Sequence, residues 1–230
     1  MYSKLKQQVY EANMALPAGG LVLLTWGNVS AIDRELGVVA IKPSGVEYDK
    51  LTPEDIVVLD LQGNIVQGRL NPSSDTPTHL ELYKMSRDIG AVVHTHSKWA
   101  TIWAQAGVDI PAYGTTHADY FYGNIPCTRK MTKAEIVADY EKNTGLVICE
   151  TIKDPSLTGG VIVANHGPFT WGADAAKAVE NAVVLEYIAE MAYYNFNMNY
   201  GLTQQRMPRP LMDKHYYRKH GKDAYYGQKK

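Results

Sequence analysis

The stretch Gly90-Ala91-Val92-Val93-His94-Thr95-His96-Ser97 is an apolar run that ends in two histidines. Its residue types predict a strand over residues 90–96, and Ser97 is a suitable cap for a helix that continues to about residue 106. Residues two apart on a strand share one face, so both imidazoles can reach one ion; on a helix they would be separated by roughly 200°. Neutral imidazoles suit Zn2+ and related divalent metals. The pair alone is a weak motif, because such a pair is more often part of an ordinary hydrogen-bonded strand.

Short apolar runs on both sides of this stretch predict further helices and strands. Apolar residues at helical spacing, with cap and proline signals, predict helices at about residues 5–16, 75–87, 132–145, 173–195 and 211–220. Runs of β-branched and aliphatic residues predict strands at residues 21–24, 37–41, 56–61, 146–149 and 161–164. The strands are short and their connections uneven, without regular βαβ units or a GxGxxG turn. This favours a layered α/β fold with a largely antiparallel or mixed sheet.

The composition is that of an ordinary globular protein of one domain, residues 1–230. With 23 Lys+Arg against 24 Asp+Glu, the chain lacks the basic footprint of a nucleic-acid-binding protein. Residues 12–32 carry no charge, but Pro17 and several glycines interrupt them, which argues against a membrane span. Cys127 and Cys149 cannot form a disulfide framework, and the N-terminus lacks the apolar region of a secretory signal. We therefore expect a cytoplasmic protein that contacts neither nucleic acid nor membrane.

A third histidine stands after another predicted strand. His166 follows the run at residues 161–164 and precedes Gly167-Pro168, so it can face the same cleft as His94 and His96. Three histidines with an exchangeable position are typical of a catalytic metal site. Asp75 is a possible fourth ligand. Two alternatives stay open on the sequence alone: His166 as a turn residue bonding local backbone, and Asp75 as a helix N-cap.

Three turns rich in small residues could bind an anion. They are residues 27–30 (Gly-Asn-Val-Ser), 42–45 (Lys-Pro-Ser-Gly) and 71–75 (Asn-Pro-Ser-Ser-Asp). Glycine permits close backbone approach, while hydroxyl, amide and backbone N–H groups can surround a phosphate. Ser73 and Ser74 also precede a predicted helix N-terminus, where the dipole favours an anion. None of the turns has the Walker spacing of a nucleotide site, and each alone is compatible with an ordinary turn.

The motifs occur in one order over nearly the whole chain: Thr25-Trp26-Gly27-Asn28-Val29-Ser30, Ile41-Lys42-Pro43-Ser44-Gly45, Pro72-Ser73-Ser74-Asp75-Thr76-Pro77-Thr78-His79, His94-Thr95-His96-Ser97, Gly114-Thr115-Thr116-His117-Ala118-Asp119-Tyr120, His166-Gly167-Pro168 and Asp213-Lys214-His215-Tyr216. Together they resemble the class II aldolase and epimerase family, and in particular its epimerases. The resemblance implies a three-layer αβα domain around a central, mainly antiparallel sheet. It also implies a homotetramer with active sites between neighbouring subunits, each completed by a neighbour's C-terminal tail at about residues 221–230.

The resemblance also assigns roles to individual residues. It implies that His94, His96 and His166 hold a divalent metal, usually Zn2+ with Mn2+ or Co2+ possible, and that Asp75 lies at or next to this metal. Proton transfer would fall to Asp119 and to Tyr226 of the adjacent subunit. The residues expected to bind or position the substrate are Gly27, Asn28, Lys42, Ser44, Gly45, Ser73, Ser74, Thr115, Glu141 and His215.

The activity implied is epimerisation of a phosphorylated pentulose. In such a reaction the C3–C4 bond of L-ribulose 5-phosphate breaks, the aldehyde rotates, and the bond forms again on its other face to give D-xylulose 5-phosphate. The metal would stabilise the enediolate, so no NAD is needed. The chain departs from the family pattern at Lys98-Trp99 and at Ala164-Asn165, and the connection over residues 152–159 is short for the family.

Two other functions are compatible with the same motifs. The nearer is a class II aldolase that cleaves a deoxyketose 1-phosphate, for which the family's acidic residue at position 75 is usually glutamate. Asp75 therefore favours the epimerase. The other is a binding module for metal or sugar phosphate without turnover, against which the presence of Asp119, Tyr226 and all three histidines argues.

Overall fold

One seven-stranded antiparallel sheet runs through the structure, a computed structural model that describes residues 2–198, 206–220, 222 and 224–227. The strand order is β4-β3-β2-β1-β5-β7-β6, and every neighbouring pair is antiparallel. The strands are β1 (Asn28–Asp33), β2 (Val38–Ile41), β3 (Val57–Asp60), β4 (Ile65–Gln67), β5 (Ala91–His94), β6 (Gly160–Ile162) and β7 (Pro168–Gly172).

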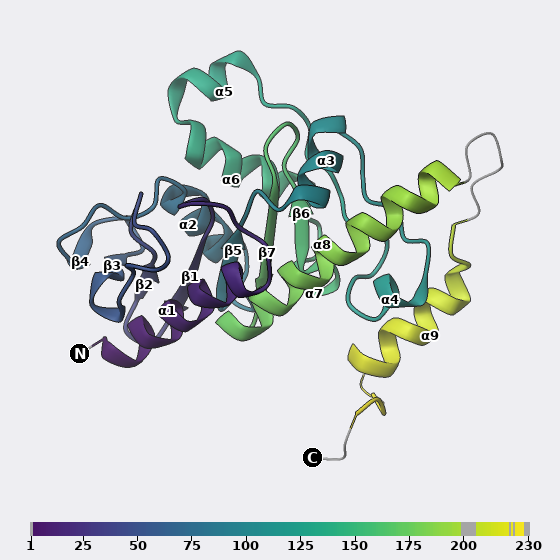
Figure 1. Ribbon diagram of the computed structural model, residues 1–230, viewed down its shortest axis with the longest axis horizontal. Coiled ribbons are helices and arrows are strands. Elements are labelled where there is room, and N and C mark those ends of the chain that lie inside the picture. Colours follow the sequence, from purple (N-terminus) through teal and green to yellow (C-terminus); the bar gives the residue numbers. More distant parts are fainter. Residues whose placement is uncertain (1, 199–205, 221, 223, 228–230) are drawn as a thin grey trace.

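Helices cover both faces of this sheet, which confirms the predicted αβα layers. On one face α1 (Ser3–Ala18) and the long α8 (Ala175–Met198) cross side by side (Figure 1). On the other face α2 (Thr76–Met85) packs against α6 (Tyr140–Thr151). Because strand side chains alternate between faces, Val93 joins the core under α1 and α8, whereas Val92 joins the core under α2 and α6.

The remaining helices lie around the ends of the sheet. They are the 3-10 helix η1 (Pro53–Asp55), α3 (Lys98–Ala106), α4 (Thr115–Ala118), α5 (Lys133–Ala138), α7 (Pro155–Thr158) and α9 (Arg209–His220). Ser97 takes the predicted N-cap position of α3, but without a side-chain hydrogen bond. The carboxylate of Glu186 on α8 instead accepts hydrogen bonds from the N–H groups of Trp99 and Ala100, at 2.8 and 2.9 Å.

Two of the predicted strands are wrong. Residues 21–24 form an irregular loop, and the strand begins later, at Asn28; Leu23 and Leu24 are exposed and find no sheet partner. Residues 146–149 belong to α6, where Thr144, Val147 and Ile148 are buried at the i, i+3, i+4 spacing of a helix. A run of four apolar residues is too short to show the hydrophobic period of a helix or a strand. Its helical conformation is stabilised by packing of α6 against α2.

The predicted helix at 132–145 is interrupted at Asp139, whose φ of −148° and ψ of 77° are not helical. Its predicted capping box is confirmed: the Thr132 hydroxyl accepts from the Glu135 N–H, and the Glu135 carboxylate accepts from the Thr132 N–H. Strands β1, β4 and β7 were not predicted, and residues 28–30, which were predicted as part of a small-residue turn, are the start of β1 because they pair with β5 and β2. Among the described residues, no helix is both long and apolar enough to cross a membrane.

The register of three central strands brings distant segments to one point. At its end, β5 pairs His94 with Asn28 of β1 on one side and with Phe169 of β7 on the other. His166 lies just before β7, so the turn that carries it meets the end of β5 as well.

Histidines buried without charge make the stability of the fold dependent on pH. The Nε2–H of His117 on α4 donates to the carbonyl of Gly123 at 2.7 Å, and burial lowers the pKa of His117 to about 4. In the unfolded chain the pKa of this histidine is near its ordinary value of about 6.5. Below that pH the His117 imidazole is therefore protonated in the unfolded chain but stays neutral in the folded chain. Stability is therefore lost as the pH falls from about 6.5 towards 4.

We predict that His117 alone lowers the free energy of unfolding by on the order of 2 kcal/mol when the pH falls from about 7.5 to about 5. The test is urea unfolding of wild type and His117→Gln at both pH values, because glutamine keeps a donor for Gly123 but does not titrate. The variant should lose less stability on acidification. Equal losses in the two proteins would mean that His117 is not held neutral.

Candidate functional site

Three histidine side chains converge at the end of β5. His94 is the last residue of that strand, His96 follows it, and His166 comes from the turn between β6 and β7. Their ring centroids lie 4.7 to 5.0 Å apart, and one ligand nitrogen from each lies within 4.8 Å of the others. The Nε2 atoms of His94 and His96 are 3.1 Å apart. The structure thus brings together the three residues that the sequence nominated as metal ligands.

Local backbone geometry orients two of these rings. His94 Nδ1 lies 3.0 Å from the carbonyl oxygen of Pro168, an acceptor for its N–H, and this contact directs Nε2 at the other rings. His166 is held in a turn by its N–H bond to the Val163 carbonyl and by Asn165 at a φ of +63°, a conformation that asparagine tolerates better than most residues. The departure from the family pattern at Asn165 therefore suits this turn.

The three rings are suited to bind a divalent cation. Burial lowers the pKa of His166 to about 3, with smaller effects from His94 and His96, and burial also lowers the pKa of His96. Metal binding requires the neutral imidazole, so protons compete little for the nitrogens of His96 and His166 near pH 7. The convergence of three imidazole nitrogens fits Zn2+ or a similar ion.

Asp75 lies beside the triad rather than within it. It lines the same cavity, and its Oδ2 accepts a hydrogen bond from Asn28 Nδ2 at 2.7 Å, but it is not one of the converging ligand groups. Burial raises the pKa of Asp75, yet the nearby His94 and His79 and the bond from Asn28 outweigh it and bring the pKa below its ordinary value. Asp75 also stands at the N-cap position of α2, without a capping side-chain bond.

A cavity of about 400 Å³ joins the triad to all three small-residue segments, of which residues 28–30 belong to β1 and the other two are turns. The predicted residues that line it, besides the histidines and Asp75, are Gly27, Asn28, Lys42, Ser44, Gly45, Ser73, Ser74 and Glu141. Thr25, Trp26, Pro43 and Tyr140 also line it and were not predicted. Trp26 and Pro43 lie inside motifs that the sequence analysis quoted, and Tyr140 adjoins Glu141, so proximity to those residues was the available signal.

Hydrogen bonds join the start of β1 and the two turns to one another. Asn28 Nδ2 donates to Ser73 Oγ at 3.0 Å, the Ser73 N–H donates to the Lys42 carbonyl at 3.1 Å, and the Ser44 N–H donates to the Asn71 carbonyl at 2.9 Å. Among the described residues no donor reaches the buried Oδ1 of Asn28, which leaves an acceptor at the cavity wall. The arrangement can hold a small polar molecule between the turns and the triad.

Lys42 is buried at this wall. Its Nζ donates to the Val46 carbonyl at 2.7 Å and faces the ring of Tyr48 at 4.8 Å. Burial lowers the pKa of Lys42 to about 8, so the ammonium is close to titrating at neutral pH. An anion in the cavity would favour its charged form.

The other predicted residues form a second cluster, at α4 and α9. The Asp119 carboxylate, which follows α4, accepts from Arg218 at 2.7 Å and from His215 at 2.9 Å. Burial raises the pKa of Asp119, but these bonds outweigh it and hold the pKa below its ordinary value. Tyr226 is exposed and its ring lies against Arg218 and Lys219, while Thr115 begins α4. None of these residues lines the cavity of the triad.

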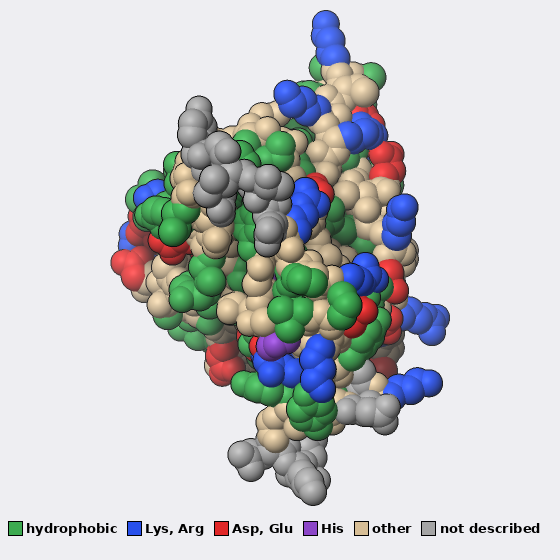
Figure 2. Space-filling model, turned by 90° about the vertical axis from the view of Figure 1, so that its right-hand side faces the viewer, with side chains coloured by type: hydrophobic (Ala, Val, Ile, Leu, Met, Phe, Trp, Pro, Cys, Tyr) green, Lys and Arg blue, Asp and Glu red, His purple; other side chains and the backbone are tan. Residues whose placement is uncertain are grey.

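Figure 2 shows the face that carries α9, where lysine and arginine side chains gather. The predicted tail at residues 221–230 is only partly described: residues 221, 223 and 228–230 lie outside the described part. Within one chain, therefore, the predicted site residues are divided between two places.

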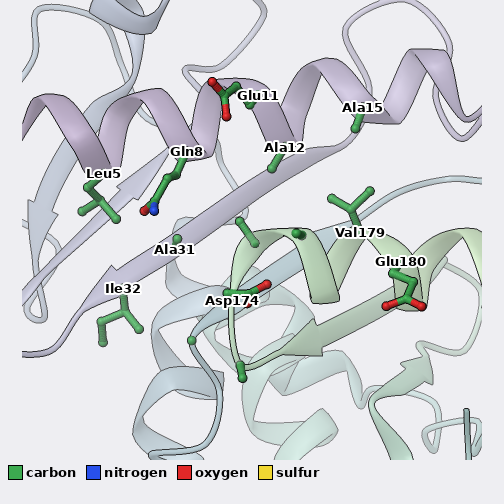
Figure 3. Close-up of a pocket in the computed structure, with 14 residues that line it drawn as sticks. Leu5, Gln8, Glu11, Ala12, Ala15, Ala31, Ile32, Asp174, Val179 and Glu180 are labelled. Atoms are coloured by element: carbon green, nitrogen blue, oxygen red, sulfur yellow. The ribbon is translucent and has the colours of Figure 1, made fainter. Parts of the chain in front are cut away.

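A larger groove of about 800 Å³ lies elsewhere, between α1, β1 and the start of α8 (Figure 3). Its walls carry small side chains such as Ala12 and Ala31, together with the carboxylates of Glu11, Asp174 and Glu180. It contains no histidine and none of the predicted site residues. The smaller cavity holds the groups with chemical function, and we regard it as the candidate site.

Comparison with known proteins gives one family and a set of solved structures. Residues 7–193 match the class II aldolase and adducin N-terminal domain. An L-fuculose 1-phosphate aldolase superposes with a TM-score of 0.76 at 28% identity, over 92% of this chain and 94% of that one. YgbL from Escherichia coli, described as an aldolase, epimerase or decarboxylase, gives 0.73 at 21% identity, over 92% and 97%. L-Fuculose 1-phosphate aldolase from Glaciozyma antarctica PI12 gives 0.76 at 15% identity, over 96% and 84%.

We predict that wild type binds one Zn2+ per chain and that His96→Asn weakens the affinity at least about 100-fold, because one of three nitrogen donors is lost. His96 is exposed, so the variant should fold normally. Competition with a chromophoric chelator measures the affinity, and His220→Gln on α9 is the matched control. Unchanged Zn2+ affinity in His96→Asn would remove His96 from the metal site.

We predict that Gly27→Ala destabilises the fold by about 1 to 3 kcal/mol. Gly27 has a φ of +80°, and a Cβ there would lie 2.7 Å from Val22 Cγ1 and 3.0 Å from the His94 carbonyl oxygen. Gly114→Ala is the control, because a Cβ at that position meets no atom within 4 Å and φ is −147°. Urea unfolding of both variants gives the comparison; equal stabilities would contradict the close packing of the Gly27 turn on β5.

Proposed function

Because the chain belongs to the class II aldolase and adducin N-terminal domain family, we propose that it is a metal-dependent L-ribulose-5-phosphate 4-epimerase. One observation carries the proposal: the His94, His96 and His166 triad shares a cavity with the small-residue turns and with Asp75. A phosphorylated pentulose has the two features that this cavity matches. Its phosphate suits the turns, and its ketose oxygens suit the triad.

The substrate would lie with its phosphate among Ser44, Gly45, Ser73 and Ser74, where backbone N–H groups, hydroxyls and the start of α2 favour an anion. Asn28 and Lys42 line the same part of the cavity and offer an amide and an ammonium group. A divalent cation at the triad, for which Zn2+, Mn2+ and Co2+ are the candidates, would act as a Lewis acid toward the ketose oxygens.

The proposed reaction breaks and re-forms one carbon–carbon bond. A base takes the proton of the C4 hydroxyl, the C3–C4 bond breaks, and its electron pair passes to the three-carbon fragment that carries C3. The other product is glycolaldehyde phosphate. Rotation of this aldehyde and addition to its opposite face, with return of a proton to the oxygen, gives D-xylulose 5-phosphate. Atoms and electrons balance without an oxidant, so NAD has no part in the scheme.

We assign the two proton transfers to Asp119 and Tyr226 of a neighbouring copy. His215 and Arg218 hold the Asp119 carboxylate, and its lowered pKa keeps it ionised at neutral pH and able to accept a proton. Tyr226 offers a hydroxyl on the exposed side of α9, next to two cations. Thr115 and Glu141 would position the substrate from the two sides.

The proposal includes a homotetramer. In one chain Asp119 and Tyr226 do not line the metal cavity, so a second copy would have to deliver them. The long helix α8 also carries an exposed stripe at helical spacing, which suits contact with another subunit. The stripe is formed by Val183, Tyr187, Met191, Tyr194 and Met198.

A second candidate is cleavage of a deoxyketose 1-phosphate, favoured by the similarity to an L-fuculose 1-phosphate aldolase at 28% identity. The same cavity and triad could serve it. Asp75 distinguishes the candidates, since its side chain is one methylene shorter than the glutamate expected in the aldolases. We place the epimerase first on this residue.

The experiment is conversion of L-ribulose 5-phosphate by metal-loaded protein without added nicotinamide, beside a chelated sample. We expect metal-dependent formation of D-xylulose 5-phosphate, restored after chelation by Zn2+, Mn2+ or Co2+. Activity that persists in demonstrably metal-free protein would refute the role of the triad. No conversion by folded, metal-bound protein would favour the aldolase, and release of free aldehyde from a deoxyketose 1-phosphate would then establish it.

We predict that Tyr226→Phe folds and assembles normally but loses about 10²- to 10⁴-fold in epimerisation rate, the usual contribution of one general acid or base. Tyr225→Phe is the matched control, because that neighbouring tyrosine is equally exposed and contacts Lys214 instead. Turnover numbers and gel-filtration volumes of both variants give the comparison. Wild-type turnover in Tyr226→Phe would remove this residue from the mechanism.

A further inference from the structure

We propose that Trp26 determines substrate specificity: its indole forms the wall of the metal cavity against which the carbon chain of the bound sugar phosphate packs. The inference rests on the proposed function and adds a contact to the carbons that neither the triad nor the phosphate turns supply. Trp26 is used by no step described above.

The indole stands directly beside the triad. Its ring centroid lies 5.9 Å from that of His96, with the ring planes at 48°. Trp26 is one of the largest side chains lining the cavity and is 49% exposed, so its surface is accessible to a bound molecule. A molecule whose ketose end reaches the histidines would therefore lie next to this ring.

The backbone under the indole is fixed from several sides. The buried Tyr48 donates its hydroxyl to the carbonyls of Trp26 and Gly27, at 2.9 and 3.0 Å. The Trp26 N–H donates to the Leu23 carbonyl at 3.0 Å. Leu24, inside this turn, has a φ of +54°, a conformation that is costly for leucine and that persists only where the surroundings impose it. The turn therefore presents the indole at a set position.

The other tryptophans have structural roles. The indole N–H of Trp103 donates to the Ala189 carbonyl, and that of Trp171 donates to the Pro155 carbonyl. Trp99 packs against Tyr193 and Tyr194. Among the described residues no acceptor for the Trp26 indole N–H is found, which leaves this donor available to a ligand hydroxyl.

The rest of the cavity explains why an aromatic wall is needed there. Most of its lining is polar: serines, an asparagine, carboxylates and histidines that suit phosphate and ketose oxygens. The C–H groups of a sugar chain gain nothing from those partners, whereas an aromatic face contacts them over a large area. Because Trp26 adjoins His96, it would contact the carbons near the metal rather than the phosphate end. Removing the indole would widen the part of the cavity that limits the length of the sugar's carbon chain.

The test uses Trp26→Phe and Trp26→Ala in the full-length, metal-loaded protein. For Trp26→Ala we expect the KM for L-ribulose 5-phosphate to rise about 10-fold, as expected for loss of one aromatic contact, and discrimination against a six-carbon ketose phosphate to weaken. Trp26→Phe should retain most of the affinity. Zn2+ affinity should stay within about twofold of wild type in both, since Trp26 donates no ligand atom to the triad.

Fluorescence gives a readout that does not depend on turnover. L-Ribulose 5-phosphate should change the emission of wild type and of Trp99→Phe, which removes a tryptophan outside the cavity, but not that of Trp26→Phe. An unchanged KM and unchanged chain-length discrimination in Trp26→Ala would overturn the proposal. So would an equal loss of Zn2+ affinity and substrate affinity, which would mean that Trp26 only supports the triad.

Failure of the proposed function has a different signature. If wild type does not convert L-ribulose 5-phosphate, the epimerase is refuted, and the fluorescence titration is repeated with a deoxyketose 1-phosphate. A change in emission that requires Trp26 would then support the wall for that substrate. A change that persists in Trp26→Phe, or no change in wild type, would overturn it.

Discussion

The pairing of His94 with Asn28 on one side and with Phe169 on the other is the constraint on which the site depends. Antiparallel register is fixed along a whole strand, and a slip by one residue would turn every side chain to the opposite face. The cores on both faces of β5, which separately bury Val92 and Val93, oppose such a slip. Packing far from the cavity thereby holds the His94 ring and the Asn28 amide side by side at the cavity.

Burial then sets the chemistry of the groups that meet there. It keeps the imidazole of His166 neutral and lowers the pKa of Lys42 to about 8, so nitrogen donors and a poised cation share one small space. Each imidazole also has an aromatic neighbour: Phe169 stacks on His94 at 4.1 Å, and Trp26 and Tyr140 lie near the other two rings. Only at His94 does the neighbour, Phe169, stack on the ring, and His96 stays exposed.

Much of this site could be predicted from the sequence, because its members lie in local motifs. The period of a strand predicts that His94 and His96 share one face. The small-residue segments are recognised by their glycine, serine, asparagine and proline content. The segments at residues 21–24 and 146–149 show where local reasoning fails. Both are short apolar runs, yet one is an exposed loop and the other lies inside α6. The first has no neighbouring strand to pair with in the described part of the chain, whereas the second packs against α2. Strand β7 was not predicted, because its extended conformation depends on hydrogen bonding to β5 and β6 rather than on its own sequence.

The sequence by itself determined the family, the layered α/β class and the residues able to bind a metal or an anion, since these follow from residue type and short-range spacing. Only the tertiary structure decided that Trp26 stands beside His96, that Asp75 lies next to the triad rather than in it, and that Asp119 and Tyr226 fall in a separate cluster. Distances between residues far apart in sequence depend on strand register and helix packing. Those are cooperative properties of the whole chain, which no single motif encodes.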